Sequence, residues 1–187
     1  MLRSAASTSF ITSALPPWSI RASACLRNFS SNRKIERGDI VVAEISAAFW
    51  EHPGQVLRSF AVGAEPTELY RDLHGPADAA FDAVIKPGAM PQQVIDAASV
   101  IEQAGFTVID DLLHGYGGGY LPPVLGTHSR PSAHIPGEPF RAGMTVVIQP
   151  NVVTLDGKAG VQTGELVRIT ETGIESLHAM PRGFMLV

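Results

Sequence analysis

The fold of this chain is decided by the stretch His114-Gly115-Tyr116-Gly117-Gly118-Gly119-Tyr120-Leu121-Pro122-Pro123. Glycines let the backbone approach a bound molecule closely, and the imidazole beside them is a candidate acid, base or ligand. A histidine that merely completes a turn would show the same pattern. The surrounding sequence must therefore decide between a functional loop and an ordinary one.

Bulk composition limits the protein to a few classes. With 187 residues, of which 45% are hydrophobic, the chain can bury one substantial core and is too short for two typical domains. The net charge of -4 argues against nucleic-acid binding, and the sequence lacks an apolar run of the roughly 20 residues that a membrane-spanning helix needs. Cys25 is the only cysteine, so a thiolate metal cluster cannot form. We expect a soluble protein that binds neither nucleic acid nor membrane.

Residues 1–35 differ in composition from the remainder. They contain no acidic residue and are rich in serine and arginine, which is typical of a mitochondrial presequence. Ser9–Ser13 has the pattern of a short strand, however, and the pair Pro16-Pro17 would interrupt a presequence helix. We therefore divide the chain into an N-terminal segment, 1–35, and a catalytic-type domain, 36–187. We predict a cytoplasmic location, with a mitochondrial one as the alternative.

Strand and helix patterns alternate in the second segment. Apolar runs predict six strands, whose ranges close this paragraph. The strands 39–47 and 56–62 form a predicted hairpin around the turn at His52-Pro53-Gly54. Helical spacing predicts helices from Thr67 to Lys86 and from Pro91 to Gly105. Asp110-Asp111 is interpreted as a solvated turn, and 122–143 as a long loop. This order favours an α+β fold. The strand ranges are 39–47, 56–62, 107–110, 144–153, 165–170 and 174–177.

Five landmarks in this order resemble the pita-bread family of Xaa-Pro aminopeptidases, methionine aminopeptidases and creatinase. The resemblance implies a pita-bread α+β domain that is incomplete at its N-terminus, because the family domain has further elements before this point. It also implies a small-molecule or peptide substrate, and a homodimer as one assembly, since family members are often dimers. The landmarks are Arg33-Lys34-Ile35-Glu36-Arg37-Gly38-Asp39, Arg58-Ser59-Phe60-Ala61-Val62-Gly63, Lys86-Pro87-Gly88, His114-Gly115-Tyr116-Gly117 and Gly143-Met144-Thr145-Val146-Val147-Ile148-Gln149-Pro150.

The resemblance also implies where metal ligands would lie. The family's peptidases hold two divalent metals with two Asp, one His and two Glu. On this chain those positions carry Glu44, Gln55, His114, Gln149 and Gly164. Amides are weak ligands that cannot neutralise two cations, so we predict no metal at this site. A single divalent metal at Glu44 and His114 ranks below the metal-free alternative.

Two further positions bear on the site. Glu165 follows Gly164, but neighbouring residues of a strand point to opposite faces, so it could replace the missing ligand only through a bulge. A second family histidine would fall near Tyr120, where the chain has neither His nor Glu. We assign Tyr120 and the amide Gln162 to substrate binding, beside Gln55 and Gln149.

The sequence leaves two main functional readings open. In the first, His114 and Glu44 are the catalytic residues of a creatinase-like or aminopeptidase-like hydrolase, which breaks a C-N bond of a small molecule or peptide without metal or other cofactor. In the second, the protein is a pseudoenzyme that keeps the pita-bread fold as a binding module. A partial domain with an incomplete sheet is a further alternative. An active metallopeptidase ranks below these readings.

Overall fold

A computed structural model describes residues 9–15, 34–50, 52–81 and 85–187. Most of the N-terminal segment 1–35, whose composition is typical of a presequence, lies outside these ranges. The segment's predicted strand is described as β1 (Ser9–Leu15), which pairs antiparallel with β2. Within the described ranges, none of the helices has the length and apolar character needed to cross a membrane.

A large sheet of nine described strands forms the body of the molecule. The predicted hairpin is confirmed as β2 (Ile40–Phe49) and β3 (His52–Ala61), which pair antiparallel along ten residues each. The predicted position of its turn was wrong, because His52, Pro53 and Gly54 belong to β3. From β3 the sheet continues through β9 (Gly164–Ile169), β7 (Thr145–Ile148), β5 (Leu113–Tyr116) and β6 (Tyr120–Leu125). At its margins β10 (Ile174–Ser176) pairs with β9, and β11 (Met185–Leu186) runs parallel to β3.

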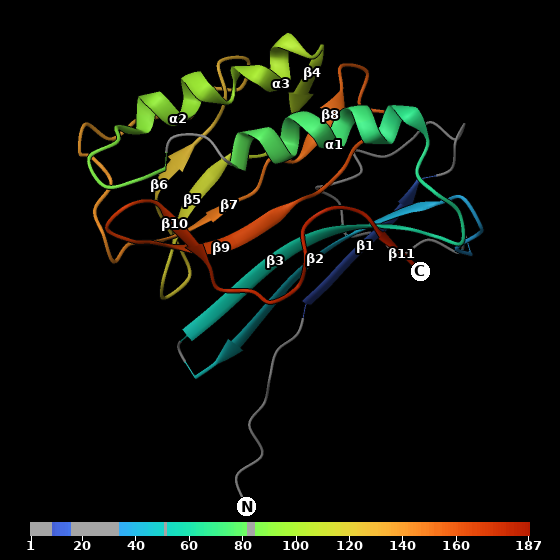
Figure 1. Cartoon of the computed structure of the whole chain (residues 1–187), viewed down its shortest axis with the longest axis horizontal. Helices are drawn as coiled ribbons and strands as arrows, with labels where there is room; N and C mark the ends of the chain where they lie inside the picture. Colours follow the sequence, from blue (N-terminus) through green and yellow to red (C-terminus); the bar gives the residue numbers. More distant parts are fainter. Residues whose placement is uncertain (1–8, 16–33, 51, 82–84) are drawn as a thin grey trace, which may run out of the picture.

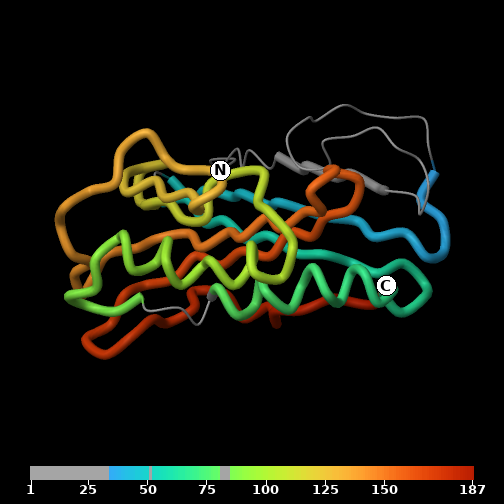
Figure 2. The backbone as a smooth tube through the Cα atoms, turned by 90° about the horizontal axis from the view of Figure 1, so that it is seen from above, coloured from blue at the N-terminus to red at the C-terminus, as the bar shows by residue number. Residues whose placement is uncertain are grey.

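The described helices form a second layer on one side of this sheet (Figure 1). They are α1 (Glu68–Phe81), α2 (Pro91–Ala97) and α3 (Ser99–Gln103). Seen from above, α1 and the pair α2–α3 follow the long axis of the molecule (Figure 2). A separate two-stranded sheet, β4 (Phe106–Val108) with β8 (Val152–Thr154), lies beside α3 and α1. This arrangement confirms the α+β prediction.

The two faces of the sheet near its centre bury different sets of side chains. Val146 and Val167 belong to the main core, which includes helix residues such as Val94 and Ile101. Val147 and Leu166 are their strand neighbours, so they point to the opposite face, where they cluster with Leu57 and Tyr116. Gln55 and Gln149 lie on this second face, because they share the alternation of Leu57 and Val147. Glu44 and His114 lie there too, since they pair directly with Leu57 and Val147.

Several predicted boundaries were wrong. The predicted second helix is broken at Ala98 into α2 and α3. The predicted strand 144–153 is two strands, β7 and β8, because the chain leaves one sheet at Pro150 for the other. Pro122 and Pro123 lie inside β6 rather than in a loop, with a register shift in the β5–β6 pair beside His114. Proline is tolerated there because β6 is an edge strand of the sheet path.

Candidate active site

A chain of polar side chains crosses the second face of the sheet. Gln55 on β3 donates from Nε2 to Glu44 Oε1 on β2 at 2.6 Å and to Gln149 Oε1 at 3.3 Å. Gln149, which follows β7, donates in turn from Nε2 to Asp111 Oδ1 at 3.1 Å. Gln55, Gln149 and Asp111 are all buried. The two carboxylates at the ends of this polar chain therefore each accept an amide N–H, Glu44 from Gln55 and Asp111 from Gln149.

His114 lies at the centre of β5, in contact with this polar chain, and is completely buried. Its Nδ1 is 3.0 Å from the carbonyl oxygen of Gly115, its ring stacks on Tyr120 with the centroids 3.9 Å apart, and Tyr116 meets it edge-on at 5.5 Å. Nε2 is buried and has no hydrogen-bond partner. Burial lowers the pKa of His114, although Gln149 and the Gly115 carbonyl act in the opposite direction. His114 is therefore uncharged at neutral pH.

Two acids that the sequence placed in a solvated turn belong to the site. Burial raises the pKa of Asp111 to about 7, and the neighbouring Asp110 adds to the shift. Burial, with a smaller contribution from Asp110, also raises the pKa of Glu44. The pKa of Tyr120 is raised by burial and by the nearby Asp111 carboxylate. The sequence offered one signal, because the doublet immediately precedes the fully buried pair Leu112-Leu113.

Leu57 occupies the space in front of Gly164, where the resemblance places the last carboxylate. A Cβ atom added to Gly164 would lie 2.4 Å from Leu57 Cδ1 and 2.9 Å from its Cβ. Leu57 is opposite Gly164 in the β3–β9 pair and is completely buried, so it cannot swing into solvent. Van der Waals contact between carbons begins near 3.5 Å. Any side chain at position 164 would therefore displace the core of this face.

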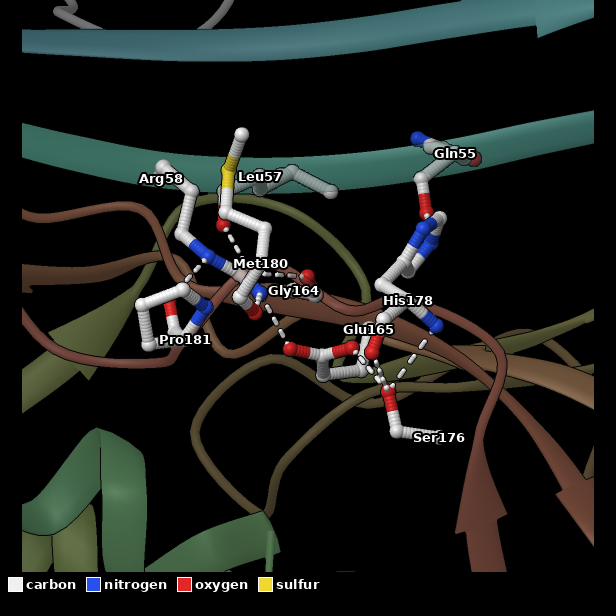
Figure 3. Close-up of polar contacts among 9 residues, drawn as sticks. All are labelled: Gln55, Leu57, Arg58, Gly164, Glu165, Ser176, His178, Met180 and Pro181. Carbon is white, nitrogen blue, oxygen red and sulfur yellow. Dashed lines mark hydrogen bonds and ion pairs between the residues drawn. The ribbon is translucent and has the colours of Figure 1, made fainter.

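Glu165 does not replace the missing ligand, because it points to the other side of the sheet. There it forms a buried ion pair with Arg58 and accepts a hydrogen bond from Ser176 Oγ at 2.7 Å (Figure 3). Arg58 also donates to the carbonyl oxygens of Leu57, Gly164, Met180 and Pro181. On the same side His178 Nε2 lies 2.7 Å from the Gln55 carbonyl oxygen (Figure 3). This network fixes β3, β9 and the C-terminal segment to one another.

Gln162 is the one predicted site residue that the structure does not join to the others. It is 1% exposed, and its backbone N–H and C=O both bond Ser59 Oγ. Neither atom of its side-chain amide has a hydrogen-bond partner. Of the others, hydrogen bonds join Glu44, Gln55 and Gln149, and the rings of His114 and Tyr120 stack on each other.

A comparison with family models identifies the fold. The model of metallopeptidase family M24 matches residues 11–171. The chain belongs to this family. An Xaa-Pro dipeptidase of Pyrococcus furiosus is 28% identical over 167 residues, which cover 86% of this chain and 45% of that protein.

Solved M24-type structures support the same assignment. The dipeptidase PepE from Mycobacterium ulcerans superposes with a TM-score of 0.78 at 27% identity, covering 98% of this chain and 48% of that chain. The methionine aminopeptidase from Rickettsia prowazekii shares the fold, with a TM-score of 0.63 at 20% identity, covering 78% of this chain and 66% of that chain. The chain spans about half the length of the curated relatives it matches. The predicted pita-bread resemblance is confirmed.

The metal pair that the M24 resemblance implies does not fit the residues at this site. At the position of the last ligand, Leu57 leaves no room for a side chain. At two other positions the amides of Gln55 and Gln149 direct N–H donors at carboxylates, where a cation would need oxygen lone pairs. Across the described ranges, no group of three or more His, Cys, Asp or Glu side chains is arranged to hold a metal ion.

Proposed function

We propose that this M24 protein is a non-peptidase member of the family, in which the pita-bread fold serves binding rather than hydrolysis. The observation that carries the proposal is the contact between Leu57 and Gly164, because it closes the last ligand position with core packing. A site that had only lost its carboxylates could still open to a metal or a substrate. A site filled by a buried leucine requires repacking first.

The polar chain supports the same proposal. Gln55 donates an amide hydrogen to Glu44, and Gln149 donates one to Asp111. These hydrogens partly offset the negative charge of the two carboxylates, which is the role that a bound cation would have. Four polar groups, from β2, from β3, from the residue after β7 and from the residues before β5, are thereby joined by hydrogen bonds. The arrangement is stable as a structural network and needs no bound metal to hold it together.

Metal-independent hydrolysis is the second candidate, and one observation favours it. His114 is neutral and its Nε2 lacks a hydrogen-bond partner, while Asp111, whose pKa is raised to about 7, supplies a protonated acid close to neutral pH. A base and an acid in one site are the elements of proton-transfer catalysis. Against this candidate, His114 is completely buried beneath Tyr120, so a substrate would first have to displace the tyrosine ring.

Metal analysis and dipeptide hydrolysis together test the proposal. The purified chain is incubated with manganese or cobalt, freed of unbound metal, and assayed for bound metal and for cleavage of a Gly-Pro dipeptide. The Xaa-Pro dipeptidase of Pyrococcus furiosus is the positive control. We expect bound metal well below one ion per chain and no cleavage above the buffer rate. One metal or more per chain, together with metal-dependent cleavage, would overturn the proposal.

Cleavage without metal would favour the second candidate instead. In that case the variant His114→Ala should lose the activity, because no other histidine belongs to the described site. His134→Ala is the matched control, since His134 is exposed. If both variants retain the wild-type rate, the activity does not come from this site.

A further inference from the structure

Tyr120 covers His114 from the outside of the sheet, and it is itself only half covered. Tyr120 is 55% exposed, whereas His114 beneath it is completely buried. Their rings stack with the centroids 3.9 Å apart and the planes 23° from parallel. Tyr120 begins β6, an edge strand of the sheet path, and the next residue, Leu121, is also exposed. One exposed ring therefore lies between a face of the His114 imidazole and solvent.

The nitrogen of His114 that could act on a ligand is identified by its neighbour. Nδ1 lies 3.0 Å from the carbonyl oxygen of Gly115. A carbonyl oxygen can only accept a hydrogen bond, so we assign the proton of the neutral ring to Nδ1 and its lone pair to Nε2. Nε2 is buried and has no hydrogen-bond partner. The basic nitrogen is thus present but closed off from solvent.

The backbone is anchored on each side of the Tyr120 ring. On the β5 side, Thr145 Oγ1 donates a hydrogen bond to the carbonyl oxygen of Tyr116. On the β6 side, the two strands approach so closely that a Cβ added to Gly115 would lie 2.2 Å from the carbonyl oxygen of Pro122. Backbones in such close contact move only together. Any independent movement is thereby confined to residues 117–121.

The segment between these anchors begins with a hinge of three glycines, Gly117, Gly118 and Gly119. A Cβ added to Gly118 or Gly119 would meet nothing within 4 Å, so no packed atoms hold the turn in place. Gly119 has a φ of 133°, a conformation that glycine adopts without strain. The hydrogen bond from the Gly117 N–H to the Gly119 carbonyl oxygen is 3.3 Å, longer than the usual range of about 2.7–3.2 Å.

We propose that Tyr120 is a hinged lid, closed in this structure, and that the glycine turn 117–119 lets it swing away and expose His114 Nε2 to a ligand. In the closed state the phenol group interacts with the Asp111 carboxyl, which acts as a latch. Opening moves an exposed ring and an unpacked turn, while the anchored strands behind them stay in place. The inference goes beyond the binding role proposed above, because it holds whether the site binds or hydrolyses.

Modification by diethyl pyrocarbonate tests the lid, because this reagent acylates an imidazole nitrogen that carries a lone pair. Peptide mass spectrometry follows His114 in the whole chain at pH 7, with the exposed His134 as the internal reference. We expect His114 to react at least tenfold more slowly than His134, and Tyr120→Ala to raise the His114 rate at least tenfold. Equal rates at the two histidines of the wild type, or an unchanged His114 rate in Tyr120→Ala, would overturn the proposal.

Thermal unfolding curves verify that the alanine variant folds. Tyr120→Leu keeps an apolar side chain but loses the stacked ring, so it provides the same test if Tyr120→Ala fails to fold.

The hinge is tested by Gly118→Ala, which restricts the backbone without a steric clash. In the wild-type background this substitution should slow the modification of His114 about two- to fivefold, because alanine has fewer open conformations to visit. In the Tyr120→Ala background it should have no effect, since the lid is already absent. Gly173→Ala is the matched control in another turn, where an added Cβ also meets nothing. No effect in the wild-type background, or the same effect in both backgrounds, would overturn the hinge.

Urea below the unfolding transition separates lid opening from loss of the fold. A lid movement exposes little surface, so the His114 rate should change little with urea, whereas a reaction through global unfolding accelerates exponentially. A steep rise would overturn the lid. The experiment needs neither dipeptide nor metal, so its outcome is separate from that of the hydrolysis assay. Slow modification that Tyr120→Ala relieves supports the lid even if the chain cleaves dipeptides.

Discussion

Replacing Gly164 with alanine should destabilise the protein through a single steric contact. The new Cβ would lie 2.4 Å from Leu57 Cδ1, 2.9 Å from its Cβ and 3.0 Å from its Cγ. Overpacking of this kind costs about 1–3 kcal/mol. The φ of Gly164 is outside the left-handed range, so alanine also restricts the unfolded chain and returns about 0.4–1 kcal/mol. We expect Gly164→Ala to lower the free energy of unfolding by about 1–2 kcal/mol.

A double-mutant cycle with Leu57→Ala isolates that contact. Leu57→Ala alone should cost about 2–5 kcal/mol, because it empties a fully buried position. In the double variant the alanine at 164 enters the space that Leu57 has left, so the combined loss should be smaller than the sum by 1 kcal/mol or more. Urea unfolding followed by circular dichroism supplies all four free energies. Gly173→Ala is the control, since its added Cβ meets nothing within 4 Å.

If the losses in unfolding free energy of Gly164→Ala and Leu57→Ala add within about 0.5 kcal/mol, this reasoning is refuted, because only sites without mutual contact are additive in that way. A neutral or stabilising Gly164→Ala would refute it more directly. Either result would mean that Leu57 can yield, and that the last ligand position of the family can be reopened by a single substitution.

Three other substitutions test different parts of the structure. Arg58→Met should cost about 3–5 kcal/mol in urea unfolding, because it leaves Glu165 buried without its ion-pair partner, and adding Glu165→Gln should recover part of the loss. The folded-state pKa of Asp111 is raised to about 7, so the native state keeps a proton that the unfolded chain loses near pH 4, and stability should fall by up to about 4 kcal/mol as pH rises between these values. Asp111→Asn should flatten that pH profile, and parallel profiles would contradict the shift. Gly115→Ala should lower the melting temperature, since its Cβ would lie 2.2 Å from the Pro122 carbonyl oxygen, whereas Gly118→Ala meets no atom and should not.

The fold could be predicted from the sequence because its signals are local and ordered. The hairpin of β2 and β3 follows from two apolar runs close together in the chain, although Pro53 and Gly54, expected in its turn, lie inside β3. The later strands keep the order that the family resemblance requires. The sequence did not predict the points at which packing divides a helix or places a proline in a strand. Ala98 carries no breaking signal, yet the helix divides there. Pro122 and Pro123 lie in β6, which tolerates proline because it is an edge strand of the sheet path.

The candidate site was only partly accessible to sequence reasoning. Glu44, Gln55, His114 and Gln149 were found because family landmarks fix their positions, and the structure places them in one network. The closure by Leu57 could not be found, since it depends on which residue of β3 lies opposite Gly164. The pairing of Asp111 with Gln149 depends in the same way on strand register rather than on spacing along the chain.

Arg58 also determines how the end of the chain unfolds. Two of the carbonyl oxygens that its guanidinium contacts belong to Met180 and Pro181, and beyond them β11 pairs with β3. Detaching the last residues would therefore leave a fully buried cation with two fewer acceptors, at a cost of about 1.5–3 kcal/mol for each. The C-terminal segment should therefore exchange its amide hydrogens more slowly than a fraying tail.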